Sequence, residues 1–147
     1  MELGNSAEAL AEAGQIAPRW RRHPEVLALY WEIHAARKQW GEALEAARTS
    51  VQLAPERVDS WIRQSFALHE LRRTQEAWDA LLPVVDLFPA DSTIPYNLAC
   101  YSCQLDQMPA ALNFLKRAMK PRGKEEVRAM ALKDEDLKPL WDQIKRL

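Results

Sequence analysis

The side chains best suited to chemistry are two cysteines separated by two residues, Cys100 and Cys103. Such a pair can belong to a zinc site or to a thiol redox site. Structural zinc takes four ligands, and the sequence has no second cysteine pair and no histidine pair near this one. A redox pair needs a thiol of low pKa at the start of a helix, in a strand–helix–strand setting. We therefore expect both thiols to pack within a helix or to line a groove.

The three histidines, His23, His34 and His69, are scattered along the chain. We expect His34 to be a hydrogen-bonded imidazole that is buried or half-buried. The sequence contains no serine–histidine–aspartate grouping, no paired carboxylates at catalytic spacing and no glycine-rich phosphate loop. It therefore predicts no catalytic residue, no metal site and no cofactor, and we expect that the protein is not an enzyme. An enzyme assembled from distant residues is the alternative, and no motif favours it.

Composition and charge narrow the classes of partner. The chain has 147 residues, of which 48% are hydrophobic and 28% are charged, as in a folded domain. The formal net charge of −1 gives no support to nucleic acid or an anionic membrane as a partner. Residues 1–13 lack the pattern of a secretory signal, and no apolar run approaches the ~18 residues that cross a bilayer. With only two cysteines, the default expectation is a cytoplasmic protein with reduced thiols.

Charge is unevenly distributed along the chain. Residues 58–91 carry six acids and three arginines, whereas residues 92–125 carry five bases and two acids. A solvated surface is the usual explanation of such a run. The alternatives for the basic run over residues 116–124 are contact with an acidic partner, with another copy of the chain, or with RNA.

The sequence repeats with a period of about 34 residues, and this period places most of the predicted helices. A small residue recurs at this spacing, and apolar residues follow it one and four positions later. The matching sets are Ala43, Ala77 and Ala111, then Leu44, Trp78 and Leu112, then Ala47, Leu81 and Leu115. Pro55 and Pro89 also coincide, although the third member of that set is Gly123.

Each repeat unit divides into two predicted helices. The first unit has helices over residues 24–38 and 42–53, and the second begins with a helix over 58–71. We expect Thr74 to cap the next helix, and Pro83 to bend that helix without ending it. The third unit begins at Ser92 as a cap, and its second helix ends before Pro121.

The ends of the chain depart from the repeat. We expect a leading helix over residues 6–17, a linker over 18–23 and a helix over 124–131. Asp134 is the predicted cap of a last helix that continues through Ile144. Helices at the ends of a stacked array cover its exposed apolar faces. We expect Trp20, in the linker, to pack onto the first helix pair, and an exposed contact is the alternative.

The repeat resembles the tetratricopeptide repeat in its period and in the motif W-x2-L-G-x2-Y…A-x3-F…P. The second unit supplies Trp61-x2-Gln64-Ser65-x2-Leu68…Ala77-x3-Leu81…Pro89. The first supplies Leu27-x2-Tyr30-Trp31-x2-His34…Ala43-x3-Ala47…Pro55, and the third supplies Leu98-Ala99-Cys100-Tyr101…Ala111-x3-Leu115. The position that is usually glycine holds Trp31, Ser65 and Ala99. Trp31 is the largest departure, and we expect it to splay the first helix pair.

The resemblance implies an all-α fold, a right-handed α-solenoid of three tetratricopeptide helix pairs with an N-terminal helix and C-terminal capping helices. A generic helical bundle is the alternative. The implied organisation is one domain over residues 1–147. Its parts are a leading helix and linker over 6–23, repeats over 24–57, 58–91 and 92–123, and cap helices over 124–147.

The resemblance also implies a binding surface, because the first helices of such repeats line a groove that takes a peptide or helix of another protein. The implied groove residues are Glu25, Ala28, Glu32, Asp59, Ile62, Arg63, Phe66, Glu70, Tyr96, Asn97, Cys100 and Gln104. The groove is apolar in its middle and acidic at one end. A partner with apolar anchors and a basic flank would complement it. The function implied is a protein-interaction module that acts as an adaptor, scaffold or co-chaperone.

Two alternatives remain open from the sequence. The C-terminal helices of the protein itself would cover the same groove residues if they fold back over the third repeat. The protein would instead be a structural subunit, or form homo-oligomers, if its charged convex surfaces make the contacts. A secretion-type chaperone that holds a client in the groove is a variant of the first function.

Overall fold

All the regular secondary structure in the part of the chain that the structure describes is helical. A computed structural model describes residues 3–147, with side chains from Asn5 onward, and contains no β-strand in that range. This confirms the predicted all-α class. None of the helices over residues 3–147 is both long and apolar enough to cross a membrane.

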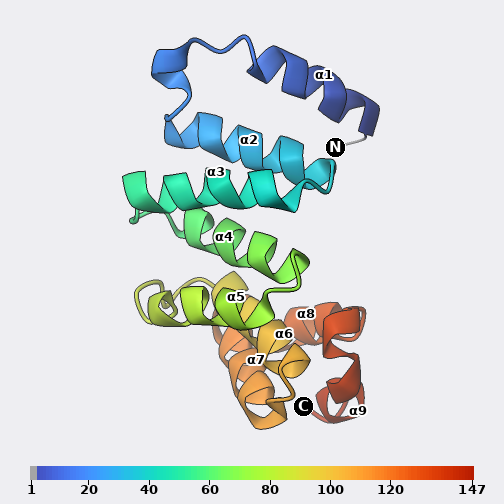
Figure 1. The fold of residues 1–147 in the computed structure, drawn as a ribbon. Helices are drawn as coiled ribbons and strands as arrows, with labels where there is room; N and C mark the ends of the chain where they lie inside the picture. Colours follow the sequence, from blue (N-terminus) through green and yellow to red (C-terminus); the bar gives the residue numbers. More distant parts are fainter. Residues whose placement is uncertain (1–2) are drawn as a thin grey trace. The chain divides into compact units, whose positions relative to one another are not determined.

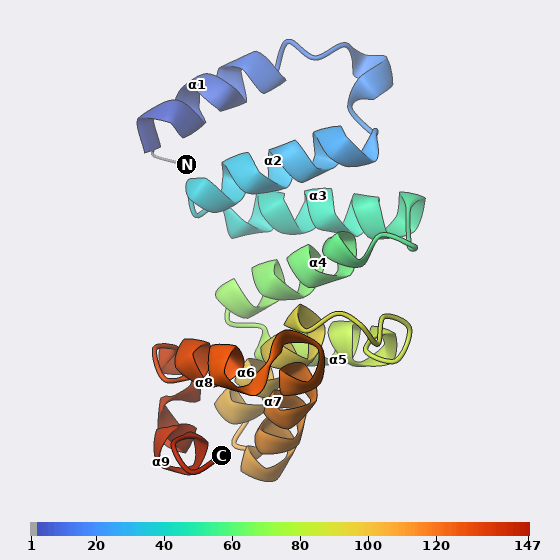
Figure 2. The ribbon, with the colours of Figure 1, turned by 180° about the vertical axis from the view of Figure 1, so that it is seen from behind.

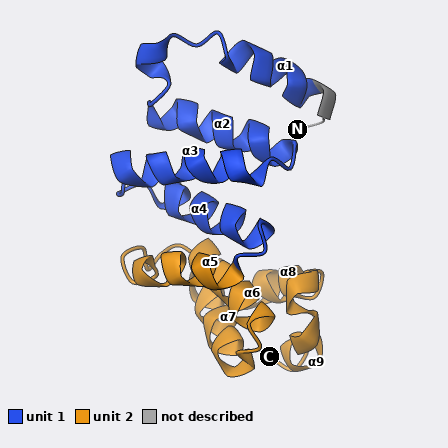
Figure 3. Cartoon of the chain, viewed as in Figure 1, with its two compact units in different colours: residues 1–73 blue, residues 74–147 orange. Residues whose placement is uncertain are grey.

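The chain divides into two compact units, residues 1–73 and 74–147 (Figure 3). The boundary falls inside the second predicted repeat, between its first and second helices. Eight of the twelve predicted groove residues therefore lie in the first unit and four in the second. That residues 1–147 form one domain stays a prediction.

The first unit consists of helices that pack in the order of the sequence (Figures 1 and 2). They are α1 (Leu3–Ala13), α2 (Pro24–Ala36), α3 (Trp40–Leu53) and α4 (Val58–Glu70), with a 3-10 turn η1 (Pro18–Trp20) in the linker. The predicted helices over 24–38, 42–53 and 58–71 are confirmed to within two residues. The leading helix ends at Ala13, before its predicted end at residue 17. Trp20 is 50% exposed, as the alternative of an exposed contact requires.

The small and apolar residues of the repeat period form the core, as predicted. Ala43, Leu44 and Ala47 of α3 are at most 2% exposed. In the second unit Ala77, Leu81, Ala111 and Leu115 are completely buried. Small residues at these positions allow neighbouring helices to approach closely, and the apolar residues beside them fill the contact.

The second unit contains α5 (Thr74–Leu81), α6 (Thr93–Gln104), α7 (Met108–Arg122), α8 (Lys124–Ala131) and α9 (Trp141–Ile144). Two 3-10 segments, η2 (Leu82–Val84) and η3 (Glu135–Leu140), join them. The predicted helix over 124–131 is confirmed. Asp134 is confirmed as a cap, because its side chain accepts a hydrogen bond from the Asp136 N–H. The predicted last helix is instead the 3-10 segment η3, followed directly by the short helix α9.

Three expectations about proline and capping residues are wrong. Pro83 ends its helix instead of bending it, because α5 stops at Leu81 and a 3-10 turn comes next. Pro121 lies inside α7, which ends one residue later. The cap of α6 is not the Ser92 side chain, since Asp91 Oδ1 accepts the Ile94 N–H at 2.9 Å. A carboxylate at that site is a stronger acceptor than a hydroxyl.

The turn between the two helices of each repeat has the same backbone conformation three times. Lys38, Arg72 and Asp106, which hold the same position in successive repeats, adopt left-handed φ angles of 56°, 62° and 59°. At each turn the next residue donates its N–H to a carbonyl five positions earlier. These bonds are Gln39 N to His34 O at 2.8 Å, Arg73 N to Leu68 O at 2.9 Å and Gln107 N to Ser102 O at 2.8 Å. This is the Schellman ending of a helix, and here it occurs without glycine.

Glycine at one of these turns is expected to stabilise the protein. A side chain at a left-handed φ is strained, and glycine removes that strain. Lys38→Gly should therefore raise the free energy of unfolding by about 0.5 to 1 kcal/mol in urea titrations. The control is Arg37→Gly, one residue earlier at φ −90°, which should lower it. Equal losses from both substitutions would contradict the role of the left-handed turn.

Candidate functional site

The eight predicted groove residues of the first unit lie on α2 and α4. Their spacing of three, four or seven positions places each set on one side of its helix. We call this surface the α2–α4 face and define it by Glu25, Ala28, Glu32, Asp59, Ile62, Arg63, Phe66 and Glu70. Ala28, Ile62, Arg63 and Phe66 are half-buried, and the four acids are exposed. The face thus has an apolar centre and charged margins.

Three aromatic rings form the base of the α2–α4 face. Trp31 of α2 lies 6.1 Å from Phe66 of α4 between ring centroids, and Trp40 of α3 lies 6.3 Å from Trp31 and 5.7 Å from Phe66. The Trp31 indole N–H also donates to the Arg63 carbonyl at 3.2 Å. Trp31 therefore ties α2 to α4. The sequence analysis did not predict this cluster. Its signal was Trp31, a large aromatic residue at the position that holds the small residues Ser65 and Ala99 in the other repeats.

The only cation among the face residues is already engaged. The Arg63 guanidinium lies 5.8 Å from the centre of the Trp31 ring and 3.5 Å from a Glu32 carboxylate oxygen. This leaves Glu25, Asp59 and Glu70 exposed, and no ion pair to them is found in the described part of the chain. Of the acids predicted at one end of the groove, Glu25 and Asp59 lie in the first turns of α2 and α4, and Glu32 is compensated by Arg63.

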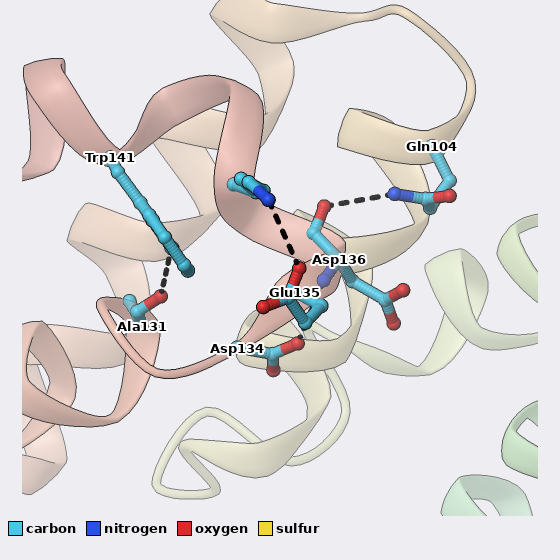
Figure 4. A network of polar contacts seen from close by, with 7 residues as sticks. Gln104, Ala131, Asp134, Glu135, Asp136 and Trp141 are labelled. Carbon is cyan, nitrogen blue, oxygen red and sulfur yellow. Dashed lines mark hydrogen bonds and ion pairs between the residues drawn. The ribbon is translucent and has the colours of Figure 1, made fainter.

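In the second unit the predicted groove residues contact the C-terminal segment of the same chain. The Tyr96 hydroxyl donates to Asp134 Oδ2 at 2.9 Å, and the Cys100 thiol lies 3.6 Å from the same oxygen. The Gln104 amide donates to the Asp136 carbonyl at 3.0 Å, as Figure 4 shows. The C-terminal segment therefore covers this part of α6, which was one of the two alternatives left open by the sequence. Asn97 is half-buried on the same helix.

This C-terminal segment is part of the core of the second unit. Leu137 and Ile144 are completely buried, and Leu140 is 1% exposed. The Trp141 indole N–H donates to the Ala131 carbonyl at 2.9 Å (Figure 4). Burying three large aliphatic side chains stabilises the folded unit by several kcal/mol, so the C-terminal segment belongs to its core.

Burial and neighbouring carboxylates keep the two thiols protonated. Burial raises the pKa of Cys100 well above its ordinary value, and Asp134 and Asp136 raise it further. Burial, followed by Asp136 and Asp106, also raises the pKa of Cys103. Metal ligands and nucleophiles are thiolates, so these environments disfavour both roles.

The single grouping of possible metal ligands among the described residues is Cys100, Asp134 and Asp136, whose ligand atoms lie within 4.8 Å of one another. Desolvation and Asp134 both raise the pKa of the Tyr96 hydroxyl, which also remains protonated. Asp134 thus accepts hydrogen bonds from an OH and an SH group. We interpret the grouping as the contact that holds the C-terminal segment on α6.

The remaining predicted side chains have structural partners. His34 is half-buried, and its Nδ1 lies 2.9 Å from Oε1 of Gln39, as expected. A second apolar feature of the first unit is an open hollow of about 310 Å³ between α1 and α2, lined by Ala9, Glu12, Ala13, Ile16 and Leu29. The resemblance did not predict this hollow, because α1 lies outside the matched repeats.

The contact between Tyr96 and Asp134 should be measurable as a coupling energy. Asp134→Ala leaves a half-buried hydroxyl without its acceptor and should lower the free energy of unfolding by about 1 to 3 kcal/mol. Combined with Tyr96→Phe, it should cost about 0.5 to 2 kcal/mol less than the sum of the single losses in urea titrations. Asp142→Ala on the exposed side of α9 is the control and should change stability little. Additive losses would exclude the coupling.

Comparison with known proteins supports the fold and leaves the family open. No protein-family model matches the chain, and no curated protein sequence matches it. Among solved structures, the crystal structure of MamA is 16% identical over 97% of this chain and 84% of that one, with a TM-score of 0.77. MamA from Desulfovibrio magneticus RS-1, residues 41 to the end, is 20% identical with the same coverages and a TM-score of 0.73.

A shorter match is to a MamA D159K mutant, 19% identical, with a TM-score of 0.59. It covers 68% of this chain, which spans 58% of the length of that one. Identities of 20% or less show a likeness of fold. The chain therefore has an all-α helical repeat fold of the kind seen in MamA.

Proposed function

We propose that this protein is a protein-interaction module and that the α2–α4 face binds a segment of another protein. The observation that carries the proposal is a difference between equivalent positions. Tyr96, Cys100 and Gln104 of α6 are occupied by the C-terminal segment of the same chain. Ile62 and Phe66 hold the equivalent positions one repeat before Tyr96 and Cys100, but both are apolar, and Phe66 contacts the rings of Trp31 and Trp40 of its own unit.

The chemistry of the α2–α4 face supports this proposal. An apolar centre with half-buried Ile62 and Phe66 offers hydrophobic area to a ligand, and exposed carboxylates surround it. Interfaces commonly combine an apolar centre with a polar rim. The aromatic base holds the two helices in place before binding, which lowers the entropic cost of association. We propose that the protein acts as an adaptor, scaffold or co-chaperone in the cytoplasm and that it is not an enzyme.

A structural or self-associating role is the second candidate, and exposed lysines favour it. Arg117 is bound to Asp86 at 2.6 Å and Arg122 to Glu126 at 2.8 Å, so part of the basic run is compensated within the second unit. The lysines of the run are exposed and without an ion pair in the described part of the chain; they are Lys116, Lys120 and Lys124. They offer three cations, each four positions from the next, to an acidic surface of another molecule.

The proposed function predicts that a polar substitution at Ile62 removes partner binding. Ile62→Asn deletes an apolar anchor and should weaken capture of a partner from the source lysate by about tenfold or more. The matched control is Leu53→Asn, because Leu53 is 45% exposed at the end of α3 and lies off the face. Quantitative mass spectrometry would compare the captured proteins after equal helicity and melting are established. Equal capture by wild type, Ile62→Asn and Leu53→Asn would place the function elsewhere.

A further inference from the structure

We infer that the segment bound by the α2–α4 face carries two cationic side chains on either side of an apolar centre. This inference rests on the proposed function and specifies its ligand. It starts from the contact that the protein makes with itself in the second unit. There α6 holds an acidic segment, because Tyr96 and Cys100 present donors to the Asp134 carboxylate, and Gln104 donates to the main-chain carbonyl of Asp136.

The equivalent positions of α4 present no donor. The residues one repeat earlier are Ile62, Phe66 and Glu70. Two are apolar, and the third is a carboxylate where α6 has the amide of Gln104. A segment with the chemistry of residues 134–136 would lose all three hydrogen bonds there and meet a like charge. The α2–α4 face therefore discriminates against an acidic segment.

Acidic residues mark both ends of the face. Glu25 and Asp59 occupy the same position in the first turns of α2 and α4, again one repeat apart. Glu70 is the last residue of α4. All three are exposed, whereas the internal cation Arg63 is held by Glu32 and the Trp31 ring. A ligand that places a cation at each end compensates these carboxylates without displacing Arg63.

The spacing of the carboxylates sets the spacing of the cations. Asp59 and Glu70 are 11 positions apart on one helix, which is about 16 Å at 1.5 Å per residue. An extended segment covers this distance in about five residues at ~3.3 Å per residue. The ligand is therefore an extended segment in which two lysines or arginines lie about five positions apart. The residues between them are apolar, so that they contact Ile62 and Phe66.

The test uses two labelled twelve-residue peptides with the same leucine–phenylalanine centre. One has lysines five positions apart around this centre, and the other has glutamates at those positions. Fluorescence anisotropy at low ionic strength should show at least tenfold tighter binding of the lysine peptide, and the difference should shrink as salt is added. Asp59→Asn combined with Glu70→Gln should weaken the lysine peptide about tenfold. Glu8→Gln combined with Glu42→Gln, which removes two exposed acids from α1 and α3, should leave it unchanged.

Three results would overturn the inference. The first is that the lysine peptide does not bind. The second is that the glutamate peptide binds as tightly or more tightly. The third is that the double substitution Asp59→Asn with Glu70→Gln leaves the affinity for the lysine peptide unchanged. The proposed function has its own readout in the capture experiment with Ile62→Asn. Loss of capture in that variant together with any of the three results would retain the binding face and reject its cationic ligand. Unchanged capture would reject the binding face itself.

Discussion

The left-handed turn inside each helix pair is the constraint on which the repeat depends. A helix pair buries its apolar stripe only if the second helix turns back along the first, and the chain has one short turn in which to reverse. The 6→1 hydrogen bond that ends α2 and α6 fixes that reversal before α3 and α7, and α4 ends with the same bond. After the turns within the two units, the small residues Ala43 of α3 and Ala111 of α7 are completely buried.

The first helices of the repeats have different surroundings in the two units, although their turns have the same backbone conformation. In the first unit an indole and a phenyl ring fill the space between α2 and α4, and the outer side of these helices keeps its acids exposed. In the second unit most residues of α6 are buried, and the corresponding side of that helix receives the C-terminal segment. One set of positions thus serves as a surface in one unit and as an internal contact in the other. The side chains at these positions differ in kind, because Tyr96, Cys100 and Gln104 carry donors where the first unit has Ile62, Phe66 and Glu70.

Much of the fold could be predicted from the sequence because it depends on local periodicity. The repeat period located α2, α3, α4, α6 and α7, since small and apolar residues at helical spacing require a buried stripe. The ends of helices were predicted less well where two local signals competed. Pro83 ended α5 after eight residues, whereas Pro121 was accommodated in the last turn of α7. After Pro83 the chain forms a turn in which Val84 and Val85 are buried, whereas α7 continues to Arg122 and is followed by Gly123 with a φ of 108°.

The candidate site was less predictable, because its properties depend on contacts between helices. Spacing alone placed Glu32 among the acids of the groove, but only the structure shows Arg63 beside it. Likewise, the sequence allowed the C-terminal segment to cover the third repeat without indicating that Asp134 would meet Tyr96 and Cys100, 38 and 34 residues away. The left-handed turns were also unpredicted, since lysine, arginine and aspartate there replace the glycine that normally signals them.

The buried C-terminal segment also has a consequence for the order in which the chain folds. In the first unit each helix packs mainly against the next one in sequence, so contacts form between residues that are synthesised close together. The second unit closes its core only when Leu137 and Leu140 of η3 pack against α6, a helix that begins at Thr93. During synthesis this side of α6 therefore stays uncovered until about forty more residues have been added. Contacts between residues so far apart in the sequence form more slowly than local ones. A nascent chain is therefore vulnerable to aggregation for as long as this side of α6 is uncovered.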